Sequence, residues 1–417
     1  MHPSLDTHID HIAALAARRT VAVQGLGFVG AAMATAVADA RDSDGAPLFD
    51  VIGIDLPNPE GEARACALNE GLFPIGCEDE TLIAAVAKAH RTGNLRASTD
   101  AASFAEADVV LIDVNLDIAF TSGGAPTVPM DRFREAIATV GRHMRPDALV
   151  IVETTVPPGT CACVVAPTLA DALRSRGEDA DRFLLAHSYE RVMPGPDYLS
   201  SVVNLWRVYA GHTGAAADAC AAFLSSIINV NEFPLRRLKH TTESETAKLL
   251  ENTYRAVNIA LIDEWSRFAE AAGVDLFDVI DAIRVRPTHN NIRQPGFGVG
   301  GYCLTKDPLF ALAGARELLD IDSLAFPLTC GAVEINRNMP LASLSLLRNA
   351  LGGRLDGRTI LLMGASYLPG VDDTRYSASE IFVTSARGEG ARVVVHDPLV
   401  RHWRELDIDI PVELPAA

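Results

Sequence analysis

Cys303 has the surroundings that a nucleophilic thiol needs. It follows a glycine-rich stretch at 298–302, and Lys306 and Asp307 come shortly after it. Pro308 then opens a predicted helix, whose positive end would stabilise a thiolate together with the ammonium group of Lys306. Two simpler explanations stay open, namely Asp307 as the N-cap of that helix and Cys303 as a buried structural thiol.

A polar stripe precedes this loop in the sequence. Its members lie three or four residues apart on one face of a predicted helix: Glu245, Lys248, Asn252 and Arg255. We expect this helix to begin at Thr242, where Thr242 and Glu245 match a capping box, and to run for about 30 residues. A solvated face is the alternative, but an asparagine between two cations better suits a cleft that polarises an oxyanion.

A glycine motif near the N-terminus predicts a site for a dinucleotide. An apolar strand at 20–24 leads into Gly25-Leu26-Gly27-Phe28-Val29-Gly30, and an alanine-rich helix follows at 31–40. In this context the first glycine permits a tight turn, the second lets backbone amides approach a pyrophosphate, and the third allows helix and strand to pack closely. A glycine turn without a ligand is the alternative.

Asp55 identifies the dinucleotide that this motif would hold. It ends the next apolar run, 49–54, about 25 residues after the glycines, at the distance expected for a group that binds the adenosine ribose. Its carboxylate would accept hydrogen bonds from the ribose hydroxyls and repel a 2'-phosphate. The sequence therefore predicts NAD in preference to NADP.

The elements that must position these residues alternate between strands and helices. Strands are expected at 20–24, 49–54, 107–114, 149–152 and 183–186, with a helix at 78–90. This alternation favours a parallel, doubly wound sheet. A further helix is expected at 308–319, and a second strand–helix–strand unit at 359–363, 377–386 and 393–396. We predict an α/β protein with two such domains joined by a long central helix: an NAD-binding domain at 1–212, a helical domain at 213–340 and a second nucleotide-type domain at 341–417.

Composition narrows the partners. The 417 residues carry a formal net charge of -18, which repels nucleic acids and anionic membranes as general partners. The N-terminal segment 1–20 lacks the features of a signal peptide, and no apolar run is long enough to cross a membrane. Seven cysteines at irregular spacing indicate free thiols, and Cys161 and Cys163 lack further ligands at metal-binding spacing. We expect a cytoplasmic protein without a metal site.

These segments together resemble the UDP-glucose/GDP-mannose dehydrogenase family, over nearly the whole chain. Five ordered motifs carry the resemblance: Gly25 to Gly30, Glu153 to Thr160 (ETTVPPGT), the run from Glu245 to Asn258, the loop from Gly298 to Asp307, and Asp372 to Ser377 (DDTRYS).

The resemblance implies a four-electron oxidation of the C6 alcohol of a nucleotide-sugar by NAD. Cys303 would trap the aldehyde as a thiohemiacetal, which a second oxidation turns into a thioester and water hydrolyses to the uronate. By position, Lys248 and Asn252 would stabilise oxyanions at C6, while Asp307 and Thr155 would orient or activate water. Glu190 is a further expected catalytic group.

The same resemblance implies that the C-terminal domain at 341–417 binds the nucleotide-sugar, and it assigns the binding residues. Cofactor contacts are expected from Gly25, Gly27, Phe28, Val29, Gly30, Asp55, Thr155 and Lys306. Substrate contacts are expected from Glu190, Arg191, Val192, Lys248, Asn252, Arg255, Gly300, Gly301, Tyr302 and Arg375.

Two signals for the sugar disagree. The segment 187–195, HSYERVMPG, is similar to the PERxxPG form of the branch that acts on UDP-N-acetylhexosamines. The loop from Gly301 to Asp307 is closer to the glucose-type GGYCLPKD form. We favour a UDP-N-acetylhexosamine and place UDP-glucose next.

Several positions depart from the family pattern. Asp117 brings an anion near the expected nicotinamide, Pro194 replaces a second glutamate of the glucose-type form, and Leu368 replaces a lysine. An arginine that a neighbouring subunit would supply could be Arg284, Arg286 or Arg293.

Three readings of the function remain. A nucleotide-sugar 6-dehydrogenase is the leading one, working as a homodimer through the apolar face of the helix at 242–271. A two-electron 3-hydroxyacid-type dehydrogenase would need neither Cys303 nor a second nucleotide-type domain. A non-catalytic sugar-nucleotide-binding subunit would fit the changes at Asp117, Pro194 and Leu368.

Overall fold

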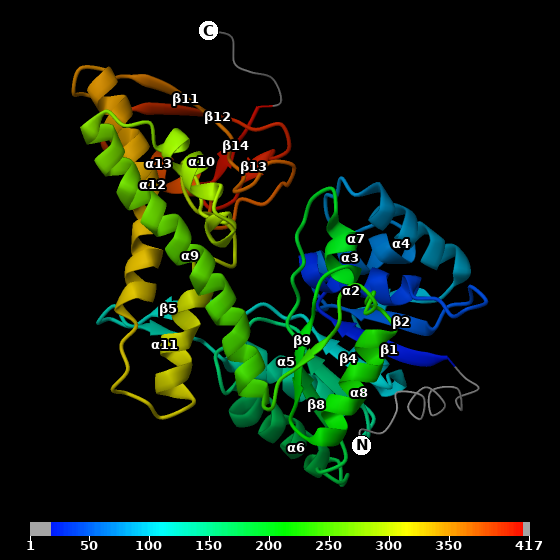
Figure 1. Ribbon diagram of the computed structural model, residues 1–417. Coiled ribbons are helices and arrows are strands. Elements are labelled where there is room, and N and C mark those ends of the chain that lie inside the picture. The colour runs from blue at the N-terminus through cyan, green and yellow to red at the C-terminus, as the bar shows by residue number, and fades with distance from the viewer. Residues whose placement is uncertain (1–17, 412–417) are drawn as a thin grey trace. The chain divides into compact units, whose positions relative to one another are not determined.

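The computed structural model describes residues 18–411 and shows a mixed α/β protein (Figure 1). The chain forms two compact units. Unit 1 comprises the described residues up to Ala119, then Thr127–Lys248 and Glu317–Asp320. Unit 2 comprises Phe120–Pro126, Leu249–Arg316 and the described residues from Ile321 onward. The prediction of three domains stays a prediction. The segment 1–20, which is expected to lack a signal peptide, lies outside the described residues up to residue 17.

Unit 1 is built on an eight-stranded sheet in the order β10-β9-β8-β7-β4-β1-β2-β3. The strands from β3 to β8 in this order pair in parallel, and β9 pairs antiparallel with β8. The bounds are β1 Arg19–Gln24, β2 Phe49–Ile54, β3 Leu95–Ser98, β4 Val109–Ile112, β7 Leu149–Val152, β8 Leu184–His187, β9 Val208–Gly211 and β10 Arg236–Arg237. Continuous apolar runs form the central strands because both of their faces are buried.

The chain reverses direction across the sheet between β1 and β4. From β1 it winds outward through β2 to β3, and it then returns to β4 on the other side of β1. Ligands of such sheets bind at the carboxyl ends of the strands that flank this switch point. The helices of unit 1 are α2 Phe28–Asp39, α3 Pro59–Asn69, α4 Glu80–Thr92, α5 Asp131–His143, α6 Ala166–Ser175, α7 Tyr198–Val203 and α8 Gly214–Ser225.

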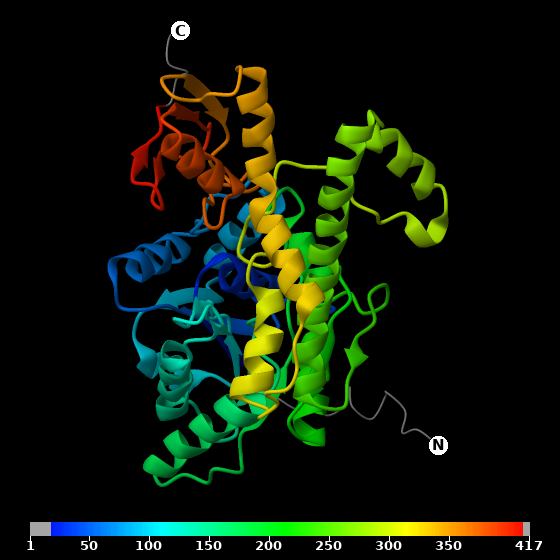
Figure 2. The same ribbon diagram turned by 90° about the vertical axis from the view of Figure 1, so that its left-hand side faces the viewer.

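A long helix, α9 (Thr241–Ala272), leaves the sheet domain and enters unit 2 without a break (Figure 2). Its 32 residues agree with the predicted helix. The remaining helices of unit 2 are α10 Leu276–Arg284, α11 Asp307–Glu317, α12 Pro327–Ala350 and α13 Ala378–Gly388. Short two-stranded sheets are formed by β5 Ala119–Phe120 with β6 Pro126–Thr127, and by β13 His402–Trp403 with β14 Ile408–Asp409.

The predicted C-terminal strand–helix–strand unit is present. β11 (Thr359–Met363) pairs in parallel with β12 (Arg392–His396), and α13 connects them. Its own apolar core includes Leu344 of α12, Phe382 of α13 and Trp403 of β13. A separate core of this kind explains why the two parts of the chain form distinct units.

The predicted capping box at the start of α9 is wrong. The Glu245 carboxylate accepts hydrogen bonds from the backbone N–H groups of Gly159 (2.6 Å) and Cys161 (2.8 Å). Glu243 reaches back instead and accepts from the N–H of Lys239 at 2.7 Å. Glu245 therefore fastens α9 to the segment that follows β7.

Candidate active site

The glycine turn after β1 leaves room for a ligand at Gly27 and is tightly packed at Gly25 and Gly30. The N–H of Gly25 donates to the carbonyl of Ile54 at 2.8 Å, and its φ of 91° lies in the left-handed region. A Cβ at Gly30 would lie 1.8 Å from the carbonyl oxygen of Gly25, so this helix start admits only glycine. A Cβ at Gly27 would meet no atom within 4 Å.

The amino end of α2 suits a phosphate group. Gly27 is the N-cap residue, no side chain caps the helix, and its first turn carries no acidic residue. The positive end of the helix dipole is therefore available to an anion. Phe28 and Val29 are half-buried in this first turn. The residues present fit the pyrophosphate of a dinucleotide.

Asp55 follows β2 next to this turn. Its carboxylate accepts hydrogen bonds from the N–H groups of Leu56 (2.8 Å) and Leu26 (3.2 Å). Arg64 of α3 pairs with the same carboxylate at 3.4 Å and with Glu60 at 2.6 Å. The carboxylate is thus held at the carboxyl end of β2, where a ribose would lie beside the glycine turn.

Three buried carboxyl groups lie at the same ends of the strands, and sequence reasoning missed two of them. Asp113 follows β4 and Glu153 follows β7. Glu153 pairs with the buried Arg207 at 3.1 Å. The two carboxylate oxygens of Asp113 are buried and have no hydrogen-bond partner in residues 18–411. The signal that could have found them is an acidic residue directly after each apolar strand.

Burial favours the protonated forms of the carboxyl groups of Asp113 and Glu153. It raises the pKa of Asp113 well above its usual range, and the charges of Glu153 and Glu190 raise it further. Burial also raises the pKa of Glu153 to about 7, against the opposing effect of Arg207. The pKa shifts of Asp113 and Glu153 therefore act in the same direction and favour the uncharged carboxyl group.

The third carboxyl group, Glu190, joins the segment after β8 to α9. Lys248 donates to the backbone carbonyl of Glu190 at 2.8 Å and lies 3.4 Å from its carboxylate. The N–H of Val192 donates to that carboxylate as well. Arg191 donates to the carbonyl of Trp206 and to the Tyr189 hydroxyl. The structure thus brings together Glu190, Val192 and Lys248 of the predicted site.

His187, at the end of β8, provides a test of this buried region by pH. Its Nδ1 lies 2.9 Å from the Ser244 hydroxyl, and burial lowers its pKa to about 3. An unfolded histidine titrates near pH 6.5, so the unfolded chain binds one more proton between those values. Stability from His187 is therefore present above pH 6.5 and is lost as the pH falls towards 3.

We expect a His187→Gln variant to lose this pH dependence. Between pH 6 and 4.5 the free energy of unfolding of the parent should fall, relative to the variant, by about 1.4 kcal/mol per pH unit. Glu153 acts in the opposite direction, because its raised pKa contributes stability at low pH that is lost as the pH rises towards 7. It is common to both proteins and cancels in the difference. Urea unfolding at several pH values measures the two slopes, and parallel slopes would contradict the assignment.

The thiol loop lies wholly in unit 2. Cys303 is exposed and lies in the turn that leads into α11, where the N–H of Asp307 donates to the carbonyl of Cys303 at 3.0 Å. The Asp307 carboxylate accepts from Lys306 at 2.7 Å and from Asn252 of α9 at 3.0 Å. Lys306, Asp307 and Asn252 are all buried.

This network corrects the N-cap explanation of Asp307. The residue begins α11 and is itself within the helix, and its carboxylate is engaged by two side chains. Burying an ion pair is costly unless its groups are hydrogen-bonded. Here both Lys306 and Asn252 donate to the Asp307 carboxylate. The arrangement places one cation, one carboxylate and one amide beside the thiol turn.

Aromatic and cationic side chains surround Tyr302. The Lys306 ammonium lies 4.2 Å from the centre of the Tyr302 ring, and the Arg375 guanidinium lies 4.9 Å from it. Arg375 also pairs with Asp373 at 2.6 Å. Tyr376 meets Tyr302 edge to face, with ring centres 5.8 Å apart. The structure therefore brings Tyr302, Lys306 and Arg375 together, with Gly300 and Gly301 in the same loop.

Other predicted residues lie apart from these contacts. Arg255 is exposed, unlike the other members of the polar stripe, and Thr155 is half-buried in the loop after β7. Among the departures, Asp117 and Leu368 are exposed and Pro194 is half-buried. Arg284 donates to the carbonyl of Ile292 at 2.8 Å, whereas Arg286 and Arg293 are exposed.

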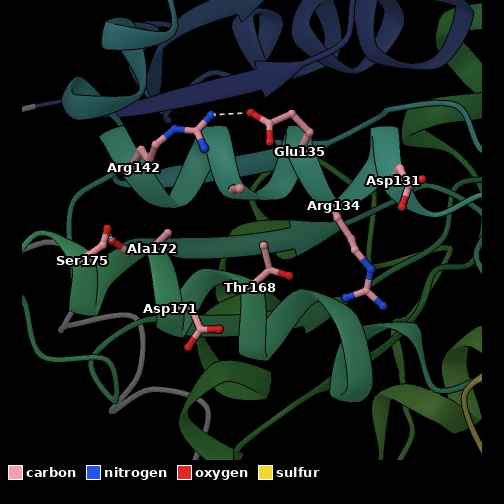
Figure 3. A pocket seen from close by; sticks show the side chains of 9 residues that line it. Asp131, Arg134, Glu135, Arg142, Thr168, Asp171, Ala172 and Ser175 are labelled. Atoms are coloured by element: carbon pink, nitrogen blue, oxygen red, sulfur yellow. Dashed lines mark hydrogen bonds and ion pairs between the residues drawn. The ribbon is translucent and has the colours of Figure 1, made fainter.

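A surface hollow of about 410 Å³ lies between α5 and α6 (Figure 3). Its lining mixes charges of both signs, including Arg134, Asp171 and an ion pair of Arg142 with Glu135 at 2.7 Å. None of the candidate site residues lines it. This hollow therefore does not coincide with the candidate site.

The central β1, the open amino end of α2 and the acidic end of β2 define a dinucleotide-binding fold. The family model described as "UDP-glucose/GDP-mannose dehydrogenase family, NAD binding domain" matches residues 19–227, and the "central domain" of the same family matches residues 242–338. The chain belongs to the UDP-glucose/GDP-mannose dehydrogenase family and is an NAD-dependent nucleotide-sugar dehydrogenase.

Curated relatives agree with this assignment. The chain is 33% identical to a UDP-N-acetyl-D-mannosamine dehydrogenase of Pyrococcus horikoshii, over 91% of this chain and 84% of the relative. It is 30% identical to an NDP-N-acetyl-D-galactosaminuronic acid dehydrogenase of Ralstonia nicotianae, over 92% of this chain and 84% of the relative.

Solved structures are also similar. The UDP-D-ManNAc dehydrogenase of Pyrococcus horikoshii matches with a TM-score of 0.77 and 29% identity, over 92% of this chain and 84% of that chain. A UDP-glucose dehydrogenase of Pyrobaculum islandicum matches with a TM-score of 0.78 and 26% identity, over 93% and 83%. No helix within residues 18–411 has the length and hydropathy of a membrane span.

Proposed function

We propose that this enzyme oxidises the C6 alcohol of a UDP-N-acetylhexosamine to the uronate in two steps, with Cys303 as the covalent nucleophile. The observation that carries the proposal is the exposed Cys303 beside the buried group of Lys306, Asp307 and Asn252. A simple alcohol dehydrogenase has no use for a thiol in this position. The relatives named UDP-N-acetyl-D-mannosamine dehydrogenase support the sugar, and UDP-glucose is the next candidate.

Each protein group has a defined part in the proposed reaction. The glycine turn from Gly25 to Gly30 and Asp55 would hold NAD, which would supply the hydride acceptor for both oxidations. The Cys303 thiolate adds to the C6 aldehyde, and the resulting oxyanion takes a proton to give the thiohemiacetal. Oxidation of that adduct gives a thioester, and water then displaces the sulfur to release the carboxylate. Lys248 and Asn252, one helical turn apart on α9, would stabilise the negative oxygen at C6.

The water that cleaves the thioester needs a base and an orienting group. We assign these roles to Asp307 and Thr155, with Glu190 as a further group near Lys248. The Lys306 ammonium lies 2.7 Å from the Asp307 carboxylate and so holds this group in place. The remaining predicted residues, Arg191, Val192, Arg255, Gly300, Gly301, Tyr302 and Arg375, are proposed to contact the substrate.

Counting NADH tests the proposal directly. Two NADH per nucleotide-sugar consumed support the thioester route, whereas one favours a two-electron alcohol dehydrogenase. If no sugar in a panel of UDP- and GDP-sugars yields NADH, a binding subunit is favoured. The exposed Asp117 and Leu368 are the departures from the family pattern that suggest this alternative. The same panel identifies the preferred sugar.

Replacement of Asp55 by serine is expected to weaken the preference for NAD over NADP. The change removes the carboxylate that repels a 2'-phosphate, while Arg64, which lies 3.4 Å from it, stays as a cation for that phosphate. We expect the ratio of kcat/KM for NAD to that for NADP to fall by about 10-fold to 100-fold. Steady-state kinetics with both cofactors measure the ratio. In a matched Glu60→Ser variant, which changes the other partner of Arg64, the preference for NAD should persist.

The apolar stripe of α9 is proposed to form a homodimer interface. Its large side chains are exposed in the single chain: Leu250, Tyr254, Leu261, Trp265 and Phe268. A row of exposed aromatic and aliphatic side chains of this size is unusual for a monomer and is typical of a surface that pairs with a second copy.

A further inference from the structure

The ring of Tyr367 lies directly against Gly300 and Gly301, which precede Cys303 in the thiol loop. A Cβ at Gly301 would lie 2.6 Å from Cε2, 2.8 Å from Cδ2 and 3.0 Å from Cζ of Tyr367. A Cβ at Gly300 would lie 2.7 Å from the Cβ of Tyr367. The backbone two residues before Cys303 therefore contacts the edge of this ring along its length, and glycine is needed at both positions for that contact.

The segment after β11 holds Tyr367 in place. Its N–H donates to the carbonyl of Asp373 at 3.1 Å, and the Ser366 hydroxyl donates to the same carbonyl at 3.0 Å. The Asp373 carboxylate in turn accepts from Nε (2.9 Å) and Nη2 (2.6 Å) of Arg375. Because backbone and side chains close this turn together, the position of the Tyr367 ring is fixed by unit 2 itself.

The Tyr367 hydroxyl is a hydrogen-bond donor at every physiological pH. Burial raises the pKa of the phenol to about 12, the charges of Asp373 and of ionised Cys303 raise it further, and Arg375 opposes them. The ionised thiol of Cys303 is thus one of the charges that raise the pKa of the phenol. A neutral donor near a thiolate favours the charged sulfur, whereas an ionised phenol would oppose it.

We propose that Tyr367 is a positioning residue for Cys303, because its ring supports the glycine turn and its neutral hydroxyl stabilises the charged sulfur. This inference rests on the proposed role of Cys303 as the nucleophile. It adds a residue from the C-terminal part of the chain to the thiol environment, next to Lys306, Asp307 and Arg375.

The rate at which iodoacetamide alkylates Cys303 tests the hydroxyl. Tyr367→Phe keeps the ring on Gly301 and removes only the oxygen. We expect its pH profile of alkylation to move upward by about 0.5 pH unit or more, so that the rate at pH 7 falls about threefold. Mass spectrometry of the peptide that contains Cys303 separates its reaction from those of the exposed Cys66 and Cys163. Tyr254→Phe, which removes an exposed phenol from α9, should leave the profile unchanged.

The ring is tested by a second variant. Tyr367→Ala should shift the profile at least as far as Tyr367→Phe and should also make the loop around Gly301 more susceptible to proteolysis. A profile for Tyr367→Phe that coincides with that of the parent overturns the role of the hydroxyl. Equal proteolysis of Tyr367→Ala and parent, with circular dichroism spectra that match, overturns the role of the ring.

The outcome is separable from the proposed reaction, because alkylation requires no sugar or NAD. A shifted profile in an enzyme that forms one NADH per sugar would keep the inference about Cys303 and reject the thioester route. Two NADH per sugar with an unchanged alkylation profile would support the thioester route and reject the role of the Tyr367 hydroxyl.

Discussion

Replacement of Cys303 by serine is expected to abolish uronate formation. A serine hydroxyl is far less acidic than a thiol and does not ionise here, so the aldehyde is no longer trapped at the enzyme. We expect the rate of uronate release to fall by about 10³-fold or more. Chromatography coupled to mass spectrometry measures the uronate, and NAD binding should persist because the glycine turn lies in unit 1.

Cys163→Ser is the matched control for this change. Cys163 is also exposed, and its sulfur contacts the backbone carbonyl of Leu318 at 3.5 Å. Its loss should leave uronate formation near the parental rate. Sustained release of uronate by the Cys303→Ser variant at the parental rate would exclude the covalent mechanism.

Gly30→Ala is expected to destabilise the NAD-binding unit and abolish NAD binding. The new methyl group would lie 1.8 Å from the Gly25 carbonyl oxygen and 3.1 Å from the Cβ of Asp113. The nearest atom belongs to the backbone, so α2 must move away from β1 to make room. Overpacking of this kind costs about 1 to 3 kcal/mol or more. Thermal unfolding and titration calorimetry with NAD measure the two effects.

Gly27→Ala separates the ligand from the fold. A Cβ at this position meets nothing within 4 Å, and the residue has an ordinary φ of -72°. The free energy of unfolding should therefore change by less than about 0.5 kcal/mol. NAD affinity should still fall, because the methyl group blocks the approach of a pyrophosphate to the amides. If the Gly30→Ala variant has the same unfolding temperature and the same NAD affinity as the parent, the proposed packing of this turn is wrong.

The fold was largely predictable because its strands carry their own signal. β2, β7 and β11 begin and end where the apolar runs do. Strands that are buried on both faces need such runs, and the glycines after β1 mark the turn. Parallel pairing and the switch point then follow from the alternation of strands and helices.

The parts of the site that depend on distant partners were not predictable. Glu245 matches a local capping box, yet it binds amides that precede it by more than 80 residues. Asp307 matches a local N-cap, yet it binds Asn252 of another helix. Asp113 and Glu153 directly follow apolar strands, but that position alone does not show that a carboxyl group is buried. The tertiary fold determines the partners of Glu245 and Asp307 and the burial of Asp113 and Glu153.

The contact between Tyr367 and the glycine turn also restricts how this loop can evolve. The atom that meets Gly300 is the Cβ of Tyr367, which every residue except glycine possesses. No exchange of one side chain for another at 367 therefore makes room for alanine at 300. Gly301 is restricted independently by its φ of 80°. The two glycines that precede Tyr302 and Cys303 are therefore expected to persist when neighbouring side chains change.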